Sequence, residues 1–127
     1  MTSIAPWLSV PDAPAAVAFY AAGFGALERE RLEDGGRVVV ARLAIDGAEF
    51  WVAEDPDARP AGGSPVRMVV TVADPDALFA QALAAGAIEV FPVGEQHGWR
   101  VGRLVDPAGH HWELGSDLAL PDEAGPN

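Results

Sequence analysis

In the first half of the chain, the pattern of apolar and polar residues predicts a strand, a helix and then three more strands. Period-two alternation over residues 4–10 predicts the first strand. Apolar residues then recur at near-helical spacing, with Asp12 placed to cap the helix and Gly23 and Gly25 placed to end it. Three further strands are predicted at residues 27–32, 37–45 and 49–53, with turns at 34–36 and 46–47.

The second half follows the same order. Residues 66–72 predict a strand, and Asp74-Pro75-Asp76 is a helix start with a cap, a proline in the first turn and an acid near the positive helix end. Gly86 ends that helix. Later strands are predicted at residues 88–93, 99–105 and 110–114, separated by a polar loop at 94–98 and a turn at 106–109.

An internal repeat relates the two halves. An offset of 62 residues maps Val10 onto Val72 and Asp12 onto Asp74, which indicates a duplicated module. Because a sheet with a single covering helix does not close its own core, either the two halves of one chain or two chains should pair, and a cleft between modules is a natural ligand site. We expect one α+β domain with a first module at 1–54, a linker at 55–65, a second module at 66–116 and a flexible acidic tail at 117–127.

Composition narrows the class of protein without indicating an activity. The chain has 127 residues, half of them hydrophobic, which is enough for one domain with a substantial core. Its net charge of −11 argues against nucleic acid or an anionic membrane as a partner. The same charge is compatible with a cationic ligand, or it simply keeps the surface soluble. Cysteine, a signal-peptide pattern and a membrane-length apolar run are absent from the sequence, so a cytoplasmic location is expected.

Two stretches resemble the sequence signatures of a known superfamily. The first is Val10-x-Asp12 leading to Phe19-Tyr20 and Gly23-Phe24-Gly25, and the second is the closing run 102–114 with its Asp106-Pro107-Ala108-Gly109 turn. Both are similar to the vicinal oxygen chelate superfamily, which includes glyoxalase I, fosfomycin-resistance proteins, extradiol dioxygenases and bleomycin-resistance proteins. The resemblance covers about residues 4–116 and implies two βαβββ modules whose curved mixed sheets enclose a cleft.

The resemblance also implies four metal-ligand positions at the cleft, two in each module. In this chain those positions hold Ala5, Trp51, Arg67 and Glu113. Only Glu113 can bind a divalent metal, because alanine has no donor, indole offers only an N–H group and arginine stays cationic. We therefore expect neither a metal nor another cofactor. A different metal site made from His97, His111 and Glu113 stays open.

The resemblance implies which face of each strand lines the cleft, including the side of Arg103, and period-two alternation extends that face to neighbouring residues. The candidate ligand-binding residues are Trp7, Ser9, Trp51, Arg67, Trp99, Arg103, His111 and Glu113. Three indoles beside a few charges suit a flat or aromatic molecule, and a second interpretation is that the indoles plug the cleft. The resemblance also implies that Arg67 lies beside Glu113, where it either presents a positive charge to a ligand or forms a structural ion pair. Trp112 is expected in the core.

Two classes of function follow. The stretch 94–109 is similar to bleomycin-resistance proteins, which are metal-free dimers that sequester a cationic aromatic drug. This resemblance implies a metal-independent homodimer that binds a small molecule such as an antibiotic. The alternative is an enzyme of the same superfamily, a lyase, isomerase or dioxygenase, with Glu113 as a general base or metal ligand and Arg67 or Arg103 holding an oxyanion. Whether the protein is an enzyme stays open at this point.

Overall fold

The chain forms two compact units, Met1–Pro60 and Ala61–Asn127. The computed structural model describes residues 2–59 and 66–118. Residues 60–65 of the predicted linker and residues 119–127 of the predicted tail therefore lie outside the described residues. The last strand of the second unit extends to Asp117, one residue into the predicted tail.

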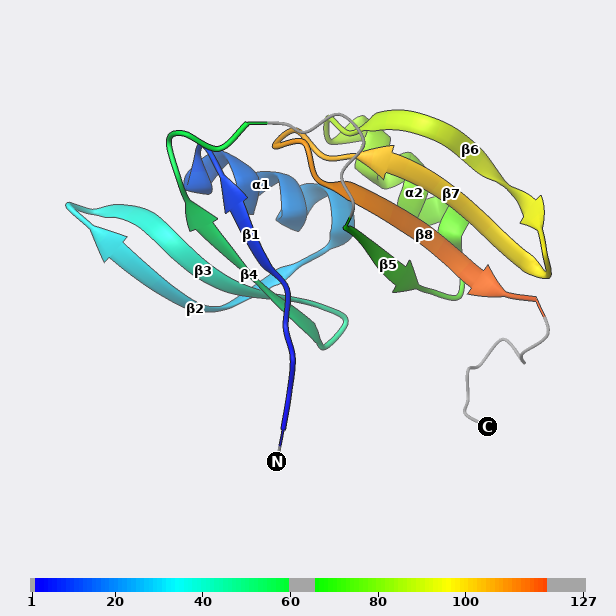
Figure 1. Ribbon diagram of the computed structural model, residues 1–127, viewed down its shortest axis with the longest axis horizontal. Coiled ribbons are helices and arrows are strands. Elements are labelled where there is room, and N and C mark those ends of the chain that lie inside the picture. Colours follow the sequence, from blue (N-terminus) through cyan, green and yellow to red (C-terminus); the bar gives the residue numbers. More distant parts are fainter. Residues whose placement is uncertain (1, 60–65, 119–127) are drawn as a thin grey trace. The chain divides into compact units, whose positions relative to one another are not determined.

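The first unit is a four-stranded mixed sheet with one helix (Figure 1). Its elements are β1 (Trp7–Val10), α1 (Ala13–Phe24), β2 (Leu27–Asp34), β3 (Arg37–Ile45) and β4 (Ala48–Glu54). The strand order is β1-β4-β3-β2. Strands β1 and β4 pair in parallel, and the other neighbours pair antiparallel. Each strand connection is therefore either a short hairpin or the crossover through α1.

The second unit repeats this topology. Its elements are β5 (Arg67–Thr71), α2 (Pro75–Ala84), β6 (Ile88–Gln96), β7 (Trp99–Val105) and β8 (His111–Asp117). The strand order is β5-β8-β7-β6, again with one parallel pair. The predicted α+β class with two βαβββ modules is confirmed. The sheets do not close into barrels, and the cleft that they are predicted to enclose stays a prediction.

The repeat extends to single residues. Trp7 lies opposite Trp51 in the register of β1 and β4, and Val69 lies opposite Glu113 in the register of β5 and β8. The offset of 62 residues relates both pairs. Positions that the sequence repeat equates are therefore equivalent in the two sheets.

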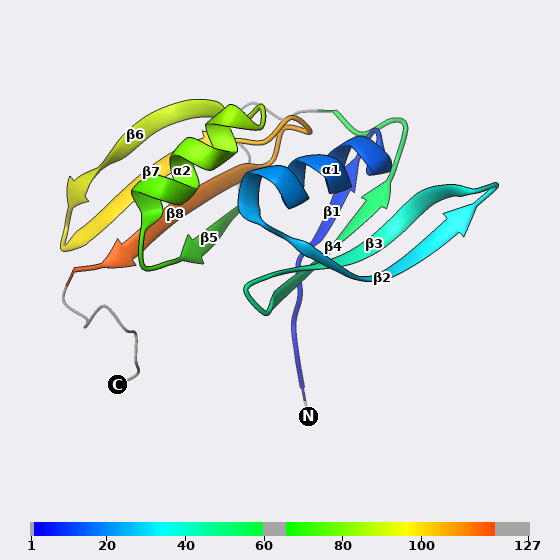
Figure 2. The same ribbon diagram turned by 180° about the vertical axis from the view of Figure 1, so that it is seen from behind.

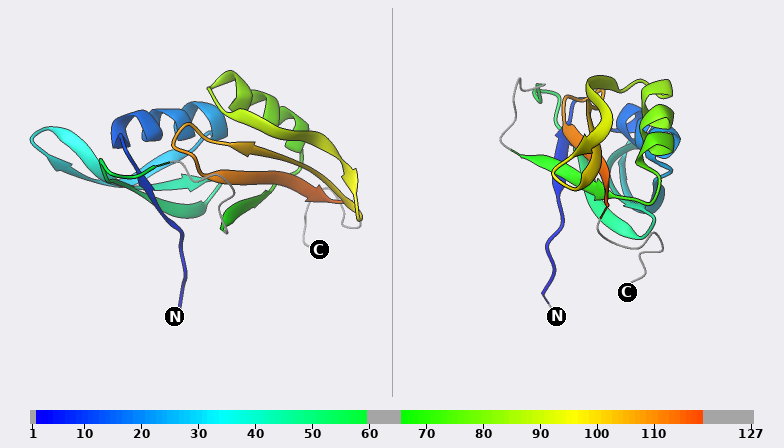
Figure 3. Two further views of the ribbon diagram at one scale, coloured as in Figure 1. Left: turned by 45° about the horizontal axis from the view of Figure 1, so that its top comes forward. Right: turned by 90° about the vertical axis from the view of Figure 1, so that its right-hand side faces the viewer.

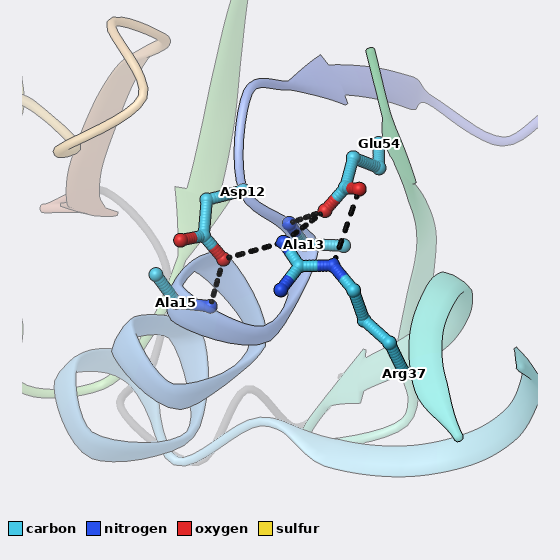
Figure 4. A network of polar contacts seen from close by, with 5 residues as sticks. All are labelled: Asp12, Ala13, Ala15, Arg37 and Glu54. Atoms are coloured by element: carbon cyan, nitrogen blue, oxygen red, sulfur yellow. Dashed lines mark hydrogen bonds and ion pairs between the residues drawn. The ribbon is translucent and has the colours of Figure 1, made fainter. Parts of the chain in front are cut away.

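Each helix begins at an aspartate that caps it. Asp12 accepts a hydrogen bond from the N–H group of Ala15 at 3.0 Å, and Asp74 accepts one from Ala77 at 3.1 Å. These bonds satisfy backbone donors that no preceding helical turn can reach. In the first unit Glu54 adds a second acceptor, because its carboxylate accepts from the N–H group of Ala13 at 2.9 Å (Figure 4).

An arginine from the β2–β3 hairpin completes this network. Arg37 donates to Glu54 at 2.7 Å and lies 3.4 Å from Asp12 (Figure 4). The hydrogen bond from Arg37, followed by that from Ala13, lowers the pKa of Glu54. The network links the start of α1 to the ends of β3 and β4.

The core of each unit lies between its helix and one face of its sheet. Helix α1 packs on β3 and β4, and α2 packs on β6, β7 and β8 (Figure 2). In the second unit the buried side chains include Phe79 of α2 with Leu104, Trp112 and Leu114 of the sheet. Fully burying such a side chain contributes about 1.5–3 kcal/mol. Within each unit, the opposite face of the sheet carries no helix among the described elements (Figure 3).

The Asp-Pro-x-Gly turn is stabilised by its first residue. One oxygen of Asp106 accepts from the N–H groups of Ala108 and His110, both at 2.9 Å. The other oxygen accepts from the indole Nε1 of Trp112 at 2.8 Å. Trp112 is buried, as predicted. The aspartate thus joins the turn before β8 to the core beneath it.

Several predicted boundaries are wrong, among them those of the first strand and of the loop before β7. The first strand covers only Trp7–Val10 instead of residues 4–10. The polar loop predicted at 94–98 is reduced to a two-residue turn, because β6 continues to Gln96. His97 and Gly98 both have positive φ, 53° and 80°, so these two residues alone reverse the chain. No helix in the described part of the chain is long and apolar enough to cross a membrane.

Candidate functional site

The second unit has a pocket of about 330 Å³ on its sheet. The residues that line this pocket are Arg67, Val69, Phe91, Gln96, His97, Trp99, Val101, Glu113 and Gly115. They come from β5, β6, β7 and β8 and from the turn between β6 and β7. The site therefore lies within one unit.

Strand alternation explains why these residues share a face. On β8, Trp112 and Leu114 are buried in the helix-side core, so Glu113 and Gly115 point to the opposite face. On β7, Leu104 belongs to the core, and Trp99 and Val101 line the pocket. The pocket is therefore on the sheet face that α2 leaves uncovered.

A glycine forms part of the pocket floor. A Cβ atom at position 115 would lie 2.9 Å from the carbonyl oxygen of Arg100 and 3.2 Å from Cβ of Val101. A larger residue would push against the backbone of β7. Gly115 thus keeps the floor low beside Val101, its cross-strand neighbour on β7, which also lines the pocket.

Arg67 and Glu113 form an ion pair at the pocket. The Nε atom of Arg67 lies 2.6 Å from a carboxylate oxygen of Glu113. The glutamate side chain is 18% exposed and the arginine side chain 46%. The expected proximity of these two residues is confirmed.

A second polar pair lies beside the first on the same sheet. The Nε atom of Arg103 donates to Nδ1 of His111 at 3.2 Å. Burial, followed by the positive charge of Arg103, lowers the pKa of His111. The imidazole is therefore neutral at pH 7, and its proton sits on Nε2 because Nδ1 accepts.

Neither arginine forms its polar side-chain contact with the residue that lies directly opposite it in the sheet. Arg67 is opposite His111 in the parallel pair, and Arg103 is opposite Glu113 in the antiparallel pair. Each arginine nevertheless contacts the diagonal residue, since Arg67 binds Glu113 and Arg103 binds His111. Diagonal neighbours are within reach of long side chains. The carboxylate of Glu113 therefore pairs with Arg67 and not with Arg103.

The first unit has an aromatic and charged cluster of its own. The rings of Trp7 and Trp51 stack with centroids 5.9 Å apart and an interplanar angle of 27°. The guanidinium of Arg42 lies 5.7 Å from the centre of the Trp51 ring and forms ion pairs with Glu30 and Glu49. Trp7 is 57% exposed. The indole of Trp7 therefore stacks on Trp51 and is still largely exposed to solvent.

The donor chemistry does not suit a divalent metal. Glu113, the one predicted metal-ligand position with a carboxylate, holds an arginine at 2.6 Å. The position equivalent to Glu113 in the first unit is Trp51, whose indole has no metal-binding lone pair. Among the described residues, no three His, Cys, Asp or Glu side chains gather as a possible metal site. The alternative set of His97, His111 and Glu113 does not gather in this way.

The predicted site residues fall into three groups. Arg67, Trp99 and Glu113 line the pocket, and Arg103 and His111 adjoin it on the same sheet. Trp7, Ser9 and Trp51 belong to the first unit. Sequence reasoning missed Phe91, because β6 shifts its register with β7 on both sides of this residue. It also missed Gln96, which was placed in a loop, and considered His97 in that loop only as a metal ligand.

Comparison with known proteins relates the chain to one family. The family model described as "Glyoxalase-like domain" matches residues 7–115. A protein of Mycobacterium bovis, named only as uncharacterized, is 38% identical over 127 residues, which cover 91% of this chain and 84% of that protein. A Mycobacterium tuberculosis protein, also named as uncharacterized, is 38% identical and is covered over 75% of its length.

Solved structures share the fold. TioX from Micromonospora sp. ML1 superposes with a TM-score of 0.73 and 27% identity, covering 93% of this chain and 100% of that one. The fosfomycin resistance protein FosX from Listeria monocytogenes superposes with a TM-score of 0.69, covering 91% and 93% of the two chains. At 19% identity FosX shows the fold alone. From the matched residues and the duplicated topology, we conclude that this chain belongs to the glyoxalase-like domain family within the vicinal oxygen chelate superfamily.

Proposed function

We propose that the protein is a metal-independent small-molecule binding protein that takes an aromatic compound in the pocket of its second unit. The observation that supports this proposal most directly is the Arg67–Glu113 ion pair, because among the described residues Glu113 is the only carboxylate that lines the pocket. Phe91 and Trp99 supply aromatic surface, and Val69, Val101 and Gly115 supply an apolar floor. A mostly apolar concavity with a few polar groups is typical of small-molecule sites.

The same observation favours an aromatic ligand over a cationic one. A cation would have to compete with Arg67 for Glu113, whereas an aromatic ring needs only the exposed faces of Phe91 and Trp99. The catalytic alternative needs Glu113 as a general base or metal ligand, and the ion pair with Arg67 opposes that role as well. We therefore favour binding over catalysis, with sequestration of an antibiotic as one form of it.

The test is a calorimetric titration of the full chain in the presence of EDTA. The neutral probe is 2-naphthamide, and bleomycin is the antibiotic probe. We expect saturable binding of 2-naphthamide that Trp99→Ala weakens. The control is Leu27→Ala, which shortens an exposed apolar side chain on β2 and should leave the affinity unchanged.

Two results would contradict the proposal. One is the absence of saturable binding by wild-type protein with either probe. The other is binding that appears only after a divalent metal is added, together with stoichiometric metal in the purified protein by elemental analysis. Circular dichroism of both variants checks that each remains folded.

A further inference from the structure

We propose that Arg103 binds an anionic group of the ligand, so that the preferred ligand class is an aromatic acid: a planar ring system bearing one carboxylate or equivalent oxyanion. This inference rests on the proposed function, because the ring occupies the pocket already described. It adds the chemical class of ligand and a specificity-determining residue outside the pocket lining.

Arg103 is placed beside the pocket by its strand neighbours. In the register of the sheet it lies opposite Phe91 on β6 and opposite Glu113 on β8, and both of these residues line the pocket. Val101, two residues earlier on the same face of β7, lines it as well. Trp99 and Arg103 are four residues apart on one strand, or about 13 Å between their Cα atoms. A two-ring compound with one acidic group suits that separation.

The guanidinium of Arg103 has no carboxylate partner. Within residues 2–59 and 66–118 no carboxylate oxygen comes within 4.0 Å of it, and its one side-chain hydrogen bond goes to neutral His111. The arginines that do form ion pairs with carboxylates in the same ranges are Arg31, Arg37, Arg42, Arg67 and Arg100. Arg103 is half-buried, so its charge is less well screened by water than that of an exposed arginine.

The contact with His111 also orients the guanidinium. Because Nε of Arg103 is the atom that donates to the imidazole, the two terminal nitrogens are the ones left to bind a ligand. Two parallel N–H groups match the two oxygens of a carboxylate. His111 is therefore a positioning residue for this interaction.

The local charge beside the pocket favours an anionic ligand, although the net charge of the whole chain is negative. The cluster of Arg67, Arg103, His111 and Glu113 contains two cations, one carboxylate and an imidazole that is neutral because its Nδ1 accepts a hydrogen bond. One positive charge thus remains next to an aromatic pocket in a chain whose net charge is −11. Because Glu113 is paired with Arg67, it does not balance the positive charge of Arg103. A ligand anion would balance that charge.

The experiment uses three probes with one ring system. The full chain is titrated calorimetrically in EDTA with 2-naphthoate, 2-naphthamide and 2-naphthylmethylammonium at pH 7.5. We expect the carboxylate to bind at least 10-fold more tightly than the amide, and the cation to bind most weakly. A charge-assisted hydrogen-bonded pair is expected to change affinity by about 10- to 100-fold.

Variants assign the effect to one side chain. Arg103→Gln should weaken 2-naphthoate by about 10- to 100-fold and leave 2-naphthamide within about 2-fold. Arg103→Lys keeps the positive charge without the two parallel N–H groups of the guanidinium, and it should restore part of the preference for the acid. The matched control is Arg29→Gln, which makes the same change in net charge at an exposed position on β2 and should alter neither affinity.

The outcomes separate this inference from the proposed function. If the amide binds and the acid binds no better, or if Arg103→Gln weakens both probes equally, the anion site is refuted and the aromatic pocket stands. If none of the three probes binds, both proposals fail. A preference for the acid that persists in Arg103→Gln refutes the role of Arg103.

Discussion

Replacing Asp106 with asparagine removes one defined hydrogen bond from the core of the second unit. In the native protein one carboxylate oxygen accepts from Ala108 and His110, and the other accepts from Nε1 of Trp112. An amide has a single acceptor oxygen, so its NH₂ group must face one of these two sets of donors. The expected orientation keeps the two backbone bonds and places the NH₂ group against the indole N–H.

The magnitude follows from burial. Asp106 and Trp112 are both only 2% exposed, so water cannot replace the lost partner. A charge-assisted hydrogen bond contributes about 1.5–3 kcal/mol, and an unsatisfied buried donor costs about 1–3 kcal/mol. Since the two effects overlap, we expect Asp106→Asn to lower the free energy of unfolding by about 2–4 kcal/mol.

The assay is urea unfolding followed by circular dichroism. Asp46→Asn is the matched control, because Asp46 occupies an exposed turn with φ of 49°, which asparagine tolerates well. We expect that control to change stability by less than about 0.5 kcal/mol. In a double-mutant cycle with Trp112→Phe, the two core changes should couple by at least about 1 kcal/mol. Coupling near zero, or equal effects at positions 46 and 106, would refute the reasoning.

Three further predictions concern packing and titration. Gly102→Ala places Cβ 2.8 Å from Cγ2 of Val93 and should cost about 1–3 kcal/mol in urea unfolding; Gly94→Ala, which has open space, should not, and equal effects would contradict the steric argument. The hydrogen bond from its arginine partner lowers the pKa of Glu54, so its stabilisation is present above pH 4.5 and is lost as pH falls through the lowered pKa. Glu54→Gln should therefore flatten the acid limb of the stability curve, and an unchanged limb counts against this network. Burial lowers the pKa of His111, so the folded state binds fewer protons than the unfolded state and stability decreases as pH falls below 6.5. An NMR titration of the ring with a midpoint at or above 6.5 would disprove that assignment.

Local signals in the sequence were sufficient to predict most of the fold. Asp12 and Asp74 are helix caps whose mechanism is entirely local, and both cap as predicted. The turn at Asp106 was also predictable, because its sequence specifies the backbone reversal. The hydrogen bond from Asp106 to Trp112 was not predicted, since it depends on how the next strand packs.

The site was predictable only as a face of a sheet. The family resemblance placed Arg67 and Glu113 on one side, and alternation added Trp99; all three line the pocket. Alternation did not place Phe91, because the register shifts of β6 break the period-two rule on which the prediction relied. Nor does alternation show that Arg103 contacts His111 in preference to Glu113, its cross-strand neighbour. That choice depends on three-dimensional competition for a single carboxylate.

The most direct test of the account is a crystal structure of the protein purified without added metal and co-crystallised with 2-naphthoate. The account predicts the naphthalene ring against Phe91 and Trp99, with the Arg67–Glu113 pair intact. A metal ion bound to Glu113 with Arg67 displaced from the carboxylate would contradict it, as would a ring bound away from the pocket of the second unit.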